Sequence, residues 1–175
     1  TNAGKSTLLN AMTKSEVEAA DQLFMTLDPT SRRLRFPREG EVVITDTVGF
    51  ISDLPKDLVT AFRATLEELA DCDLLLHVVD AADPRLEDKI KAVERILEDL
   101  DLLGMERLMV FNKADLVEED RLTELVRHHR GVAVSALKRQ GLRRLISACE
   151  DRLQPDRPMM PEWDRWSAEA PASGG

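Results

Sequence analysis

Short apolar runs alternate along the chain with longer segments whose apolar residues recur every three or four positions. The strand candidates are 34–36, 41–45, 74–79, 108–111 and 132–134. The runs 74–79 and 108–111 contain no acidic, lysine or arginine side chain, which is typical of parallel strands covered on both faces. Strands that alternate with helices predict an α/β fold, a mostly parallel sheet flanked by helices.

Helices are predicted where apolar residues repeat with the period of an α-helix. They are expected over 6–12, 58–69, 84–104, 119–129 and 142–149. Pro84 suits the first turn of its helix, and Gly104 and Gly131 are typical of helix ends. Residues 37–40 read as a hairpin turn between two strands. His77, inside an apolar run, is expected to be a hydrogen-bonded core residue rather than a ligand.

The chain has 175 residues, 43% apolar and 33% charged, which suits one globular domain. Apolar periodicity ends near residue 153, so 1–153 are expected to form the domain and 154–175 a flexible tail. No apolar run approaches the roughly 20 residues of a membrane-spanning helix. Cys72 and Cys149 are expected to be reduced and buried. We therefore predict a cytoplasmic monomer without a transmembrane segment.

A net charge of −9 argues against a surface that coats DNA or RNA in general, because phosphate backbones need clustered cations. Two basic clusters, at 31–35 and 138–144, leave local contact with RNA open. Solvated faces of a strand and a helix are the simpler interpretation of both clusters. We accordingly predict no DNA partner.

The first residues match the end of a phosphate-binding loop, G-x-x-x-x-G-K-[ST]. In such a loop, backbone N–H groups and the positive end of the following helix surround phosphate oxygens. The residues expected to line it are Asn2, Ala3, Gly4, Lys5, Ser6 and Thr7. Lys5 would reach the β- and γ-phosphates, which makes it a catalytic candidate, and the Ser6 hydroxyl would bind Mg²⁺.

A second group of candidates lies on either side of the two predicted strands 34–36 and 41–45: Thr26 comes before the first strand, and Asp46 and Gly49 come after the second. Asp46 could hold Mg²⁺ through its water shell, and Gly49 has no side chain to keep its N–H from a γ-phosphate. The alternative for Asp46 is an acid that only makes a turn at the strand end, and the spacing to Gly49 argues against it. Thr26 is our candidate for a hydroxyl that closes on the metal in a nucleotide-dependent switch, with Thr30 as the alternative. Gly49 and Thr26 complete the catalytic candidates, although an ordinary turn at 28–29 would also explain that segment.

The tetrapeptide Asn112-Lys113-Ala114-Asp115 follows a predicted strand and predicts selection of a guanine base. A carboxylate accepts two hydrogen bonds, so Asp115 matches the N1–H and 2-amino donors of guanine, which adenine lacks. Asn112 would join the purine to the phosphate loop, and the stem of Lys113 would cover the base face. A further base-edge loop would consist of Ser135, Ala136 and Leu137, with the alanine N–H donating to the guanine oxygen. Motifs at successive strand ends predict that GTP or GDP binds with Mg²⁺.

Together these motifs resemble the HflX family of GTPases. The resemblance is carried by Asn-Ala-Gly-Lys-Ser-Thr at 2–7, Thr-Leu-Asp-Pro-Thr at 26–30 and the stretch 46–68, which begins Asp-Thr-Val-Gly-Phe-Ile-Ser-Asp-Leu-Pro. It implies a P-loop fold of the Ras type and a cytosolic protein that binds the large (50S) ribosomal subunit, with members that split or rescue stalled ribosomes. Because the motif lacks its first glycine, we expect that glycine, the first strand and the family's N-terminal domain to lie upstream of Thr1.

The resemblance also bears on mechanism. Phe50 stands where many small GTPases carry a water-orienting glutamine, which predicts slow intrinsic hydrolysis accelerated by a partner; packing on the helix 58–69 is its alternative role. Asn2 matches a position from which related GTPases coordinate K⁺, a cation that would offset phosphate charge. The predicted function is Mg²⁺-dependent GTP hydrolysis in a ribosome-associated switch. The alternatives are a non-catalytic guanine-nucleotide-binding module and a ribosome-assembly GTPase of the Obg or Era type.

Overall fold

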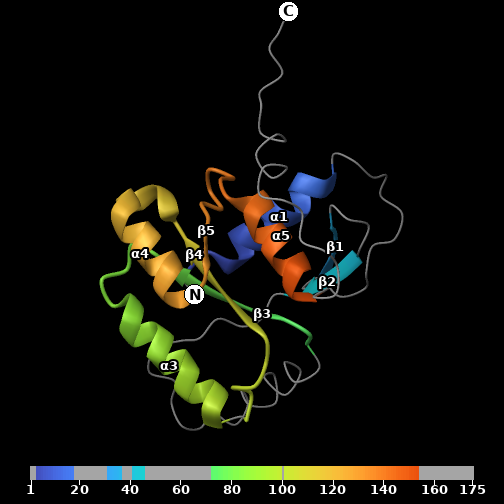
Figure 1. Cartoon of the computed structure of the whole chain (residues 1–175). Coiled ribbons are helices and arrows are strands. Elements are labelled where there is room, and N and C mark those ends of the chain that lie inside the picture. The colour runs from blue at the N-terminus through green and yellow to red at the C-terminus, as the bar shows by residue number, and fades with distance from the viewer. Residues whose placement is uncertain (1–2, 18–30, 37–40, 46–71, 100, 154–175) are drawn as a thin grey trace, which may run out of the picture.

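The computed structural model describes residues 3–17, 31–36, 41–45, 72–99 and 101–153 (Figure 1). The predicted helix 58–69, the turn 37–40 and the tail 154–175 lie outside these residues. The elements, in chain order, are α1 (Lys5–Val17), β1 (Ser31–Arg35), β2 (Glu41–Thr45), β3 (Leu75–Asp80), α3 (Leu86–Asp99), β4 (Arg107–Asn112), the 3-10 turn η2 (Ala114–Leu116), α4 (Glu119–His129), β5 (Val132–Ala133) and α5 (Leu142–Leu153). Their alternation confirms the predicted α/β fold.

Three parallel strands in the order β3-β4-β5 form the main sheet. Side chains of β4 alternate between two cores. Leu108 and Val110 pack in a core with α1 and α5, whereas Met109 and Phe111 pack in a core with α3 and α4. All four side chains are buried, because β4 has a strand on each side and helices over both faces (Figure 1). The burial predicted for 108–111 is confirmed.

The neighbouring strand β3 is less covered than its apolar run predicts. His77 and Val79 are buried, but Leu75, Leu76 and Val78 are partly exposed. Within the described part of the chain β3 pairs with β4 alone, so one of its edges has no strand beside it. The run correctly predicted a strand with a core on each face, but burial is complete only for His77 and Val79, because Leu76 and Val78 pack against the α1–α5 core in part.

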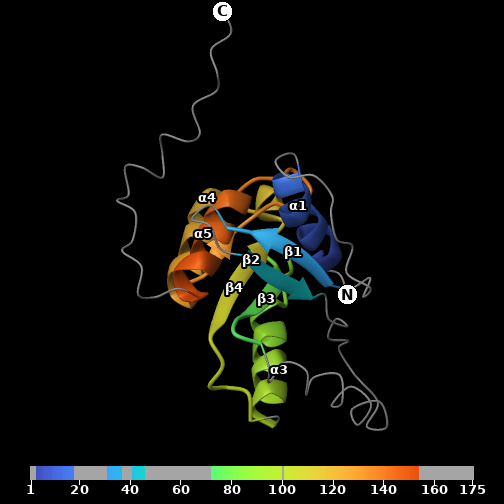
Figure 2. The same cartoon turned by 90° about the vertical axis from the view of Figure 1, so that its right-hand side faces the viewer.

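The strands β1 and β2 pair antiparallel, as the predicted hairpin requires. They form a separate two-stranded sheet that lies beside α1 (Figure 2). Leu34 and Phe36 point into the core shared by α1 and α5, while Val43 on β2 is 60% exposed. No strand pairing between β2 and β3 occurs among the residues that the structure describes.

The start of α3 shows how a capping side chain sets a helix boundary. Asp83 Oδ1 accepts the N–H of Arg85 at 2.8 Å, and the Asp83 carbonyl accepts the N–H of Leu86 at 3.1 Å. These contacts form a capping turn that contains Pro84, and the regular helix α3 begins after it, at Leu86. Helix α1 also continues well past its predicted end at residue 12.

The end of α4 agrees with the sequence prediction. Arg130 follows the helix with a left-handed φ of 51°, and the Gly131 N–H then donates to the Val126 carbonyl at 3.0 Å. A Cβ at Gly131 would lie 2.7 Å from the Met109 carbonyl oxygen and 2.7 Å from a ring carbon of Phe111. This glycine is therefore required where α4 turns back onto β4.

The two cysteines have different surroundings. Cys149 lies on the buried face of α5 with Leu142, Leu145 and Ile146, as predicted, and burial raises the pKa of its thiol to about 12. Cys72 precedes β3 and is exposed, so its predicted burial was wrong. It lies before the strand enters the sheet, where the core does not reach.

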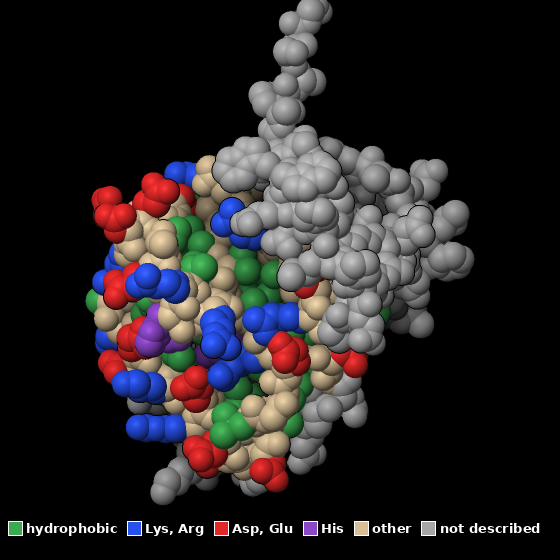
Figure 3. Space-filling view, in the orientation of Figure 1, with side chains coloured by type: hydrophobic (Ala, Val, Ile, Leu, Met, Phe, Trp, Pro, Cys, Tyr) green, Lys and Arg blue, Asp and Glu red, His purple; other side chains and the backbone are tan. Residues whose placement is uncertain are grey.

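Acidic and basic side chains are interspersed on the face that carries α4 and α5 (Figure 3). Arg143 and Arg144, from the predicted cluster 138–144, are exposed on α5. The side chains of 31–33 and 35 lie outside the described ones. The described part of the basic clusters fits the interpretation of a solvated helix face.

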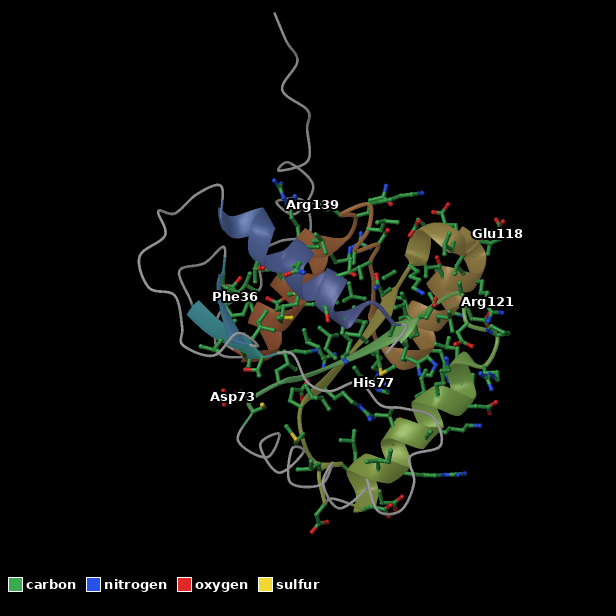
Figure 4. All side chains as sticks on the ribbon, turned by 180° about the vertical axis from the view of Figure 1, so that it is seen from behind. Phe36, Asp73, His77, Glu118, Arg121 and Arg139 are labelled. Carbon is green, nitrogen blue, oxygen red and sulfur yellow. The ribbon has the colours of Figure 1, made fainter. Side chains whose placement is uncertain are left out.

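His77 is buried on the side of β3 that faces α3 (Figure 4). Burial, together with the nearby charges of Arg107 and His129, lowers its pKa from 6.5 to about 4. The prediction of a core histidine is confirmed. Its ring is less satisfied than expected, because Nδ1 finds no hydrogen-bond partner in the described structure.

We expect the protein to lose stability as the pH is lowered from about 6.5 to about 4. In this interval the unfolded chain binds a proton at His77 and the folded chain does not, so the free energy of unfolding rises with pH. The contribution of His77 is complete above pH 6.5. The full contribution is roughly 3 kcal/mol. Urea unfolding of wild type and His77→Gln across this range measures it. The variant should show a smaller pH dependence, and equal dependence in both proteins would assign the effect to other groups.

Candidate nucleotide-binding site

The start of α1 lies against the carboxyl end of β4. Gly4 has a left-handed φ of +79°, and a Cβ here would lie 2.6 Å from Asn112 Nδ2. Glycine is therefore required both by the backbone and by the available space. The Leu8 N–H donates to the Gly4 carbonyl at 2.9 Å, so the helix begins directly after this close approach. The first turn of α1 is thus held at the edge where strands of the main sheet end.

The polar side chains of this first turn lie at the surface. Lys5 is partly buried, and Ser6 and Thr7 are exposed. A hydroxyl at a helix N-terminus suits both a phosphate and a hard cation such as Mg²⁺, which prefers oxygen ligands. The Ser6 hydroxyl therefore fits the predicted metal. No group of three or more His, Cys, Asp or Glu that could hold a metal occurs among the described residues.

Asn112 joins the start of α1 to the loop after β5. It ends β4, is 2% exposed, and donates from Nδ2 to the Ala3 carbonyl at 2.7 Å. Its Oδ1 accepts the Ala136 N–H at 3.0 Å. One buried side chain therefore bridges the predicted phosphate loop and the predicted base-edge loop, residues more than a hundred positions apart in the chain. A buried amide with both ends occupied fixes these loops relative to each other.

Asp115 lies in η2, and its carboxylate is held by the loop that follows β5. The side chain is 8% exposed, and Lys138 Nζ lies 3.4 Å from Oδ2. A hydrogen bond from the Ser135 hydroxyl is the main cause that lowers the pKa of Asp115, with smaller contributions from its own backbone N–H and from Lys138. Asp115 is therefore ionised at neutral pH, as a group that accepts two hydrogen bonds must be.

The loop 135–137 follows β5 and closes on itself. Ser135 and Gln140 exchange both backbone hydrogen bonds at 3.0 Å, and Gly141 returns the chain with a φ of +74°. Ser135 and Ala136 are buried within it, whereas Leu137 is 82% exposed. Ala136 therefore lies on the inner side of this loop and the Leu137 side chain on its outer, exposed side.

Lys113 has a partner that the sequence did not reveal. Its ammonium lies 2.6 Å from Asp80 Oδ2, and its φ of 61° is left-handed. Asp80 ends β3 and pairs in register with Asn112 of β4. The signal was present, since an acid directly after an apolar strand is the pattern that singled out Asp46. It was overlooked because the run was interpreted only as core.

Three of the predicted segments, 3–7, 112–115 and 135–137, therefore meet at the carboxyl ends of β4 and β5. Asn2, Thr26, Asp46 and Gly49 lie outside the described residues, as do Thr30 and Phe50. What the described part can offer a ligand is a helix N-terminus, a lysine, two hydroxyls and a fixed carboxylate. That combination suits an anionic ligand with a hydrogen-bond-donating ring.

Comparison with known proteins agrees with this geometry. Residues 1–113 match the family described as 50S ribosome-binding GTPase. The chain is 50% identical over 153 residues to GTPase HflX of Caldanaerobacter subterraneus subsp. tengcongensis, covering 87% of this chain and 35% of that protein. GTPase HflX of Escherichia coli is 49% identical over 158 residues, with 87% and 37% covered. The chain thus spans about a third of the length of these curated relatives.

A solved structure supports the same fold. A GTP-binding protein from the archaeon Sulfolobus solfataricus, in complex with GDP, superposes with a TM-score of 0.71 at 26% identity and covers 89% of this chain and 50% of its own. Together with the match to the GTPase family, this superposition confirms the predicted fold class. None of the described helices of this chain is both long enough and apolar enough to cross a membrane.

Proposed function

This chain belongs to the HflX family of GTPases, and from that premise we propose that it binds GTP with Mg²⁺ and hydrolyses it to GDP and phosphate. Water would attack the γ-phosphorus while the bond between that phosphorus and the bridging β–γ oxygen breaks, and GDP would leave with that oxygen. One proton of the water would stay on the phosphate and the other would be released to solvent. The proposal includes a ribosome-associated switch whose partner is the large subunit. It also includes cytoplasmic location, a monomeric state, 1–153 as the GTPase domain and 154–175 as a flexible tail.

The observation that carries the proposal is the bridge made by Asn112. It holds the Ala3 carbonyl and the Ala136 N–H at once, at 2.7 and 3.0 Å. A ligand that spans these two loops would place one end at the N-terminus of α1, which favours an anion, and the other end beside the Asp115 carboxylate, which favours a ring with hydrogen-bond donors. A guanosine phosphate has this shape, and the ionised Asp115 next to the bridge supplies the acceptor that guanine needs.

Base binding would exchange hydrogen bonds rather than create a new pocket. The guanine oxygen would take or share the Ala136 N–H that Asn112 Oδ1 now accepts. Asp115 would accept from the two donors of the guanine edge, while Ser135 and Lys138 keep the carboxylate ionised. Adenine presents no pair of donors there, so it would leave a buried charge without its partners.

The phosphates would lie at the first turn of α1. Lys5 would contact the β- and γ-phosphates. The backbone N–H groups of Ala3, Gly4 and Thr7 would donate hydrogen bonds to the same phosphates. Ser6, Asp46 and Thr26 would hold Mg²⁺, which supplies charge neutralisation at the β- and γ-oxygens when bound. Asn2 would hold K⁺ at the same phosphates.

Positioning of the attacking water would limit the intrinsic rate. Phe50 cannot hydrogen-bond to water, and Gly49 would present only its backbone N–H to the γ-phosphate. A partner that reshapes the residues 46–60 would then raise the rate. This is the property that a switch timed by ribosome contact requires.

Phosphate release from GTP tests the proposal. We expect slow turnover of the purified protein, faster turnover when large ribosomal subunits are added, and none with ATP under either condition. A parallel assay in Na⁺ instead of K⁺ tests the proposal that Asn2 holds K⁺, because only that proposal predicts slower turnover in Na⁺. Tight GTP binding without phosphate release, with subunits and K⁺ present, would instead support a non-catalytic guanine-nucleotide-binding module.

The non-catalytic module stays under consideration because Phe50 stands where many small GTPases carry a water-orienting glutamine. A ribosome-assembly GTPase of the Obg or Era type is the other alternative, and the stretch 46–68 favours the HflX assignment over it. Stimulation by small subunits rather than large ones would support the assembly alternative.

A further inference from the structure

Asp80 stands outside every motif that the nucleotide proposal uses, yet it contacts one of them. It is the last residue of β3 and lies directly opposite Asn112 in the parallel register. The Ala81 N–H donates to the Asn112 carbonyl at 2.8 Å, which joins the two strand ends at the position where the base loop begins. The backbone of Asp80 is therefore held in register with that of Asn112.

Both carboxylate oxygens of Asp80 are engaged. Oδ1 accepts the Ala82 N–H at 3.0 Å, and Oδ2 lies 2.6 Å from the Lys113 ammonium. The two side chains are partly buried, with 19% of Asp80 and 35% of Lys113 exposed. An ion pair in such a setting is screened less than one at the open surface, and a carboxylate fixed by a turn loses little further freedom when it forms.

The backbone of Lys113 is held as firmly as its ammonium. Its φ of 61° is left-handed, which is uncommon for a residue other than glycine. The Ala114 N–H donates to the Val134 carbonyl at 3.0 Å, and the Leu116 N–H donates to the Lys113 carbonyl at 3.0 Å. With both ends fixed, the four-carbon stem between them has few conformations left, so its direction is set before any ligand arrives.

We propose that Asp80 is a positioning residue for purine binding, which acts by anchoring the ammonium of Lys113 so that the lysine stem forms one wall of the base site. The inference rests on the proposed function, because it takes a guanosine nucleotide as the ligand. An unanchored lysine would have to order its stem on binding, and its ammonium would be drawn toward the carboxylate of Asp115 two residues further on. Either effect weakens the base contact and leaves the phosphate contacts unchanged.

Asp80→Asn is the appropriate substitution because asparagine keeps the oxygen that accepts the Ala82 N–H and loses the charge that holds Lys113. We expect the dissociation rate of fluorescent GDP to rise about tenfold. GMP affinity should fall by the same factor, since GMP has the same base and fewer phosphates. The melting temperature without nucleotide should stay close to wild type, because a partly exposed ion pair contributes little to stability.

Asp83→Asn is the matched control. Asp83 lies in the same loop, caps the Arg85 N–H and pairs with Lys89 on α3, so it resembles Asp80 in chemistry but does not contact the base loop. Its substitution should leave GDP dissociation unchanged. An equal effect of the two substitutions would show that the loop acts through general stability and would overturn the inference.

A double-mutant cycle tests the route through Lys113. Lys113→Met keeps most of the stem and removes the ammonium, so Asp80→Asn should add nothing in that background. Full, independent effects of the two substitutions would contradict the proposal, as would a wild-type dissociation rate in Asp80→Asn. Wild-type protein that fails to bind GDP at all would instead remove the proposed function and this inference with it.

Discussion

Asp115→Asn is expected to weaken GTP and GDP binding by roughly a hundredfold and to create binding of xanthosine nucleotides. The carboxylate accepts two hydrogen bonds from guanine, and each hydrogen bond to a charged group contributes about 1.5–3 kcal/mol. An asparagine amide presents one donor and one acceptor, which match the 2-carbonyl and N1–H of xanthine. Calorimetric titration of wild type and variant with GDP and xanthosine diphosphate measures the exchange.

The surroundings of Asp115 predict that this exchange leaves the fold intact. Lys138 is 55% exposed and Ser135 can donate to an amide oxygen as well as to a carboxylate, so neither partner becomes a buried unpaired group. Asp120→Asn, in the exposed first turn of α4, is the control for removal of one acidic charge. A variant that keeps its preference for guanine would remove Asp115 from the base site.

Lys5→Ala is expected to weaken GTP and GDP binding by about a hundredfold or more. The ammonium would contact the β- and γ-phosphates directly, and its loss leaves their charge with only the helix N-terminus and the metal. GMP binding should change far less, because GMP lacks both phosphates. Competition of GTP, GDP and GMP against a fluorescent guanine nucleotide measures the three affinities.

The same substitution at Lys91, exposed on α3, serves as the control for loss of a lysine. It should leave all three affinities unchanged. If Lys5→Ala weakened GMP binding as strongly as GTP binding, Lys5 would act through the fold of α1 rather than through contact with the phosphates. The pattern is the reverse of the one expected for Asp80→Asn, which affects GMP and GDP alike, so the two variants report on opposite ends of the ligand.

Apolar periodicity predicted the elements that surround β4 well. Leu108 to Phe111 are bounded by polar residues on both sides, and their burial on two faces followed from the absence of any charge among them. The helix at 119–129 was bounded correctly because Gly131 stops it at a place with no room for a Cβ. Where the residues that bound an element agree with its packing in the fold, the sequence is sufficient to predict that element.

The errors have local causes that no pattern of apolar residues reports. The start of α3 depends on a capping contact between Asp83 and the backbone, and the exposure of β3 depends on which strands lie beside it. Cys72 was expected inside because cysteines are often buried, but it lies before the strand begins. These features are set by neighbours distant in the chain or by single hydrogen bonds.

The candidate site was predictable as a set of motifs but not as a network. Spacing singled out Asn112 and Asp115, and it anticipated the contact of Asn112 with the phosphate loop. It did not anticipate that Ala136 already donates to Asn112, or that Asp80 pairs with Lys113. Those partners come from a different strand and a different loop, and only the register of β3, β4 and β5 brings them together.

The central claim is that three distant loops close on one guanosine phosphate. Amide hydrogen exchange with and without GDP and Mg²⁺ tests it most directly, because it reads the protection of each loop separately. The account predicts that GDP slows exchange together at 3–7, 112–116 and 135–138, with no change along the outer face of α3, and that ADP has no effect. Protection confined to one of these segments, or equal protection by ADP, would contradict it.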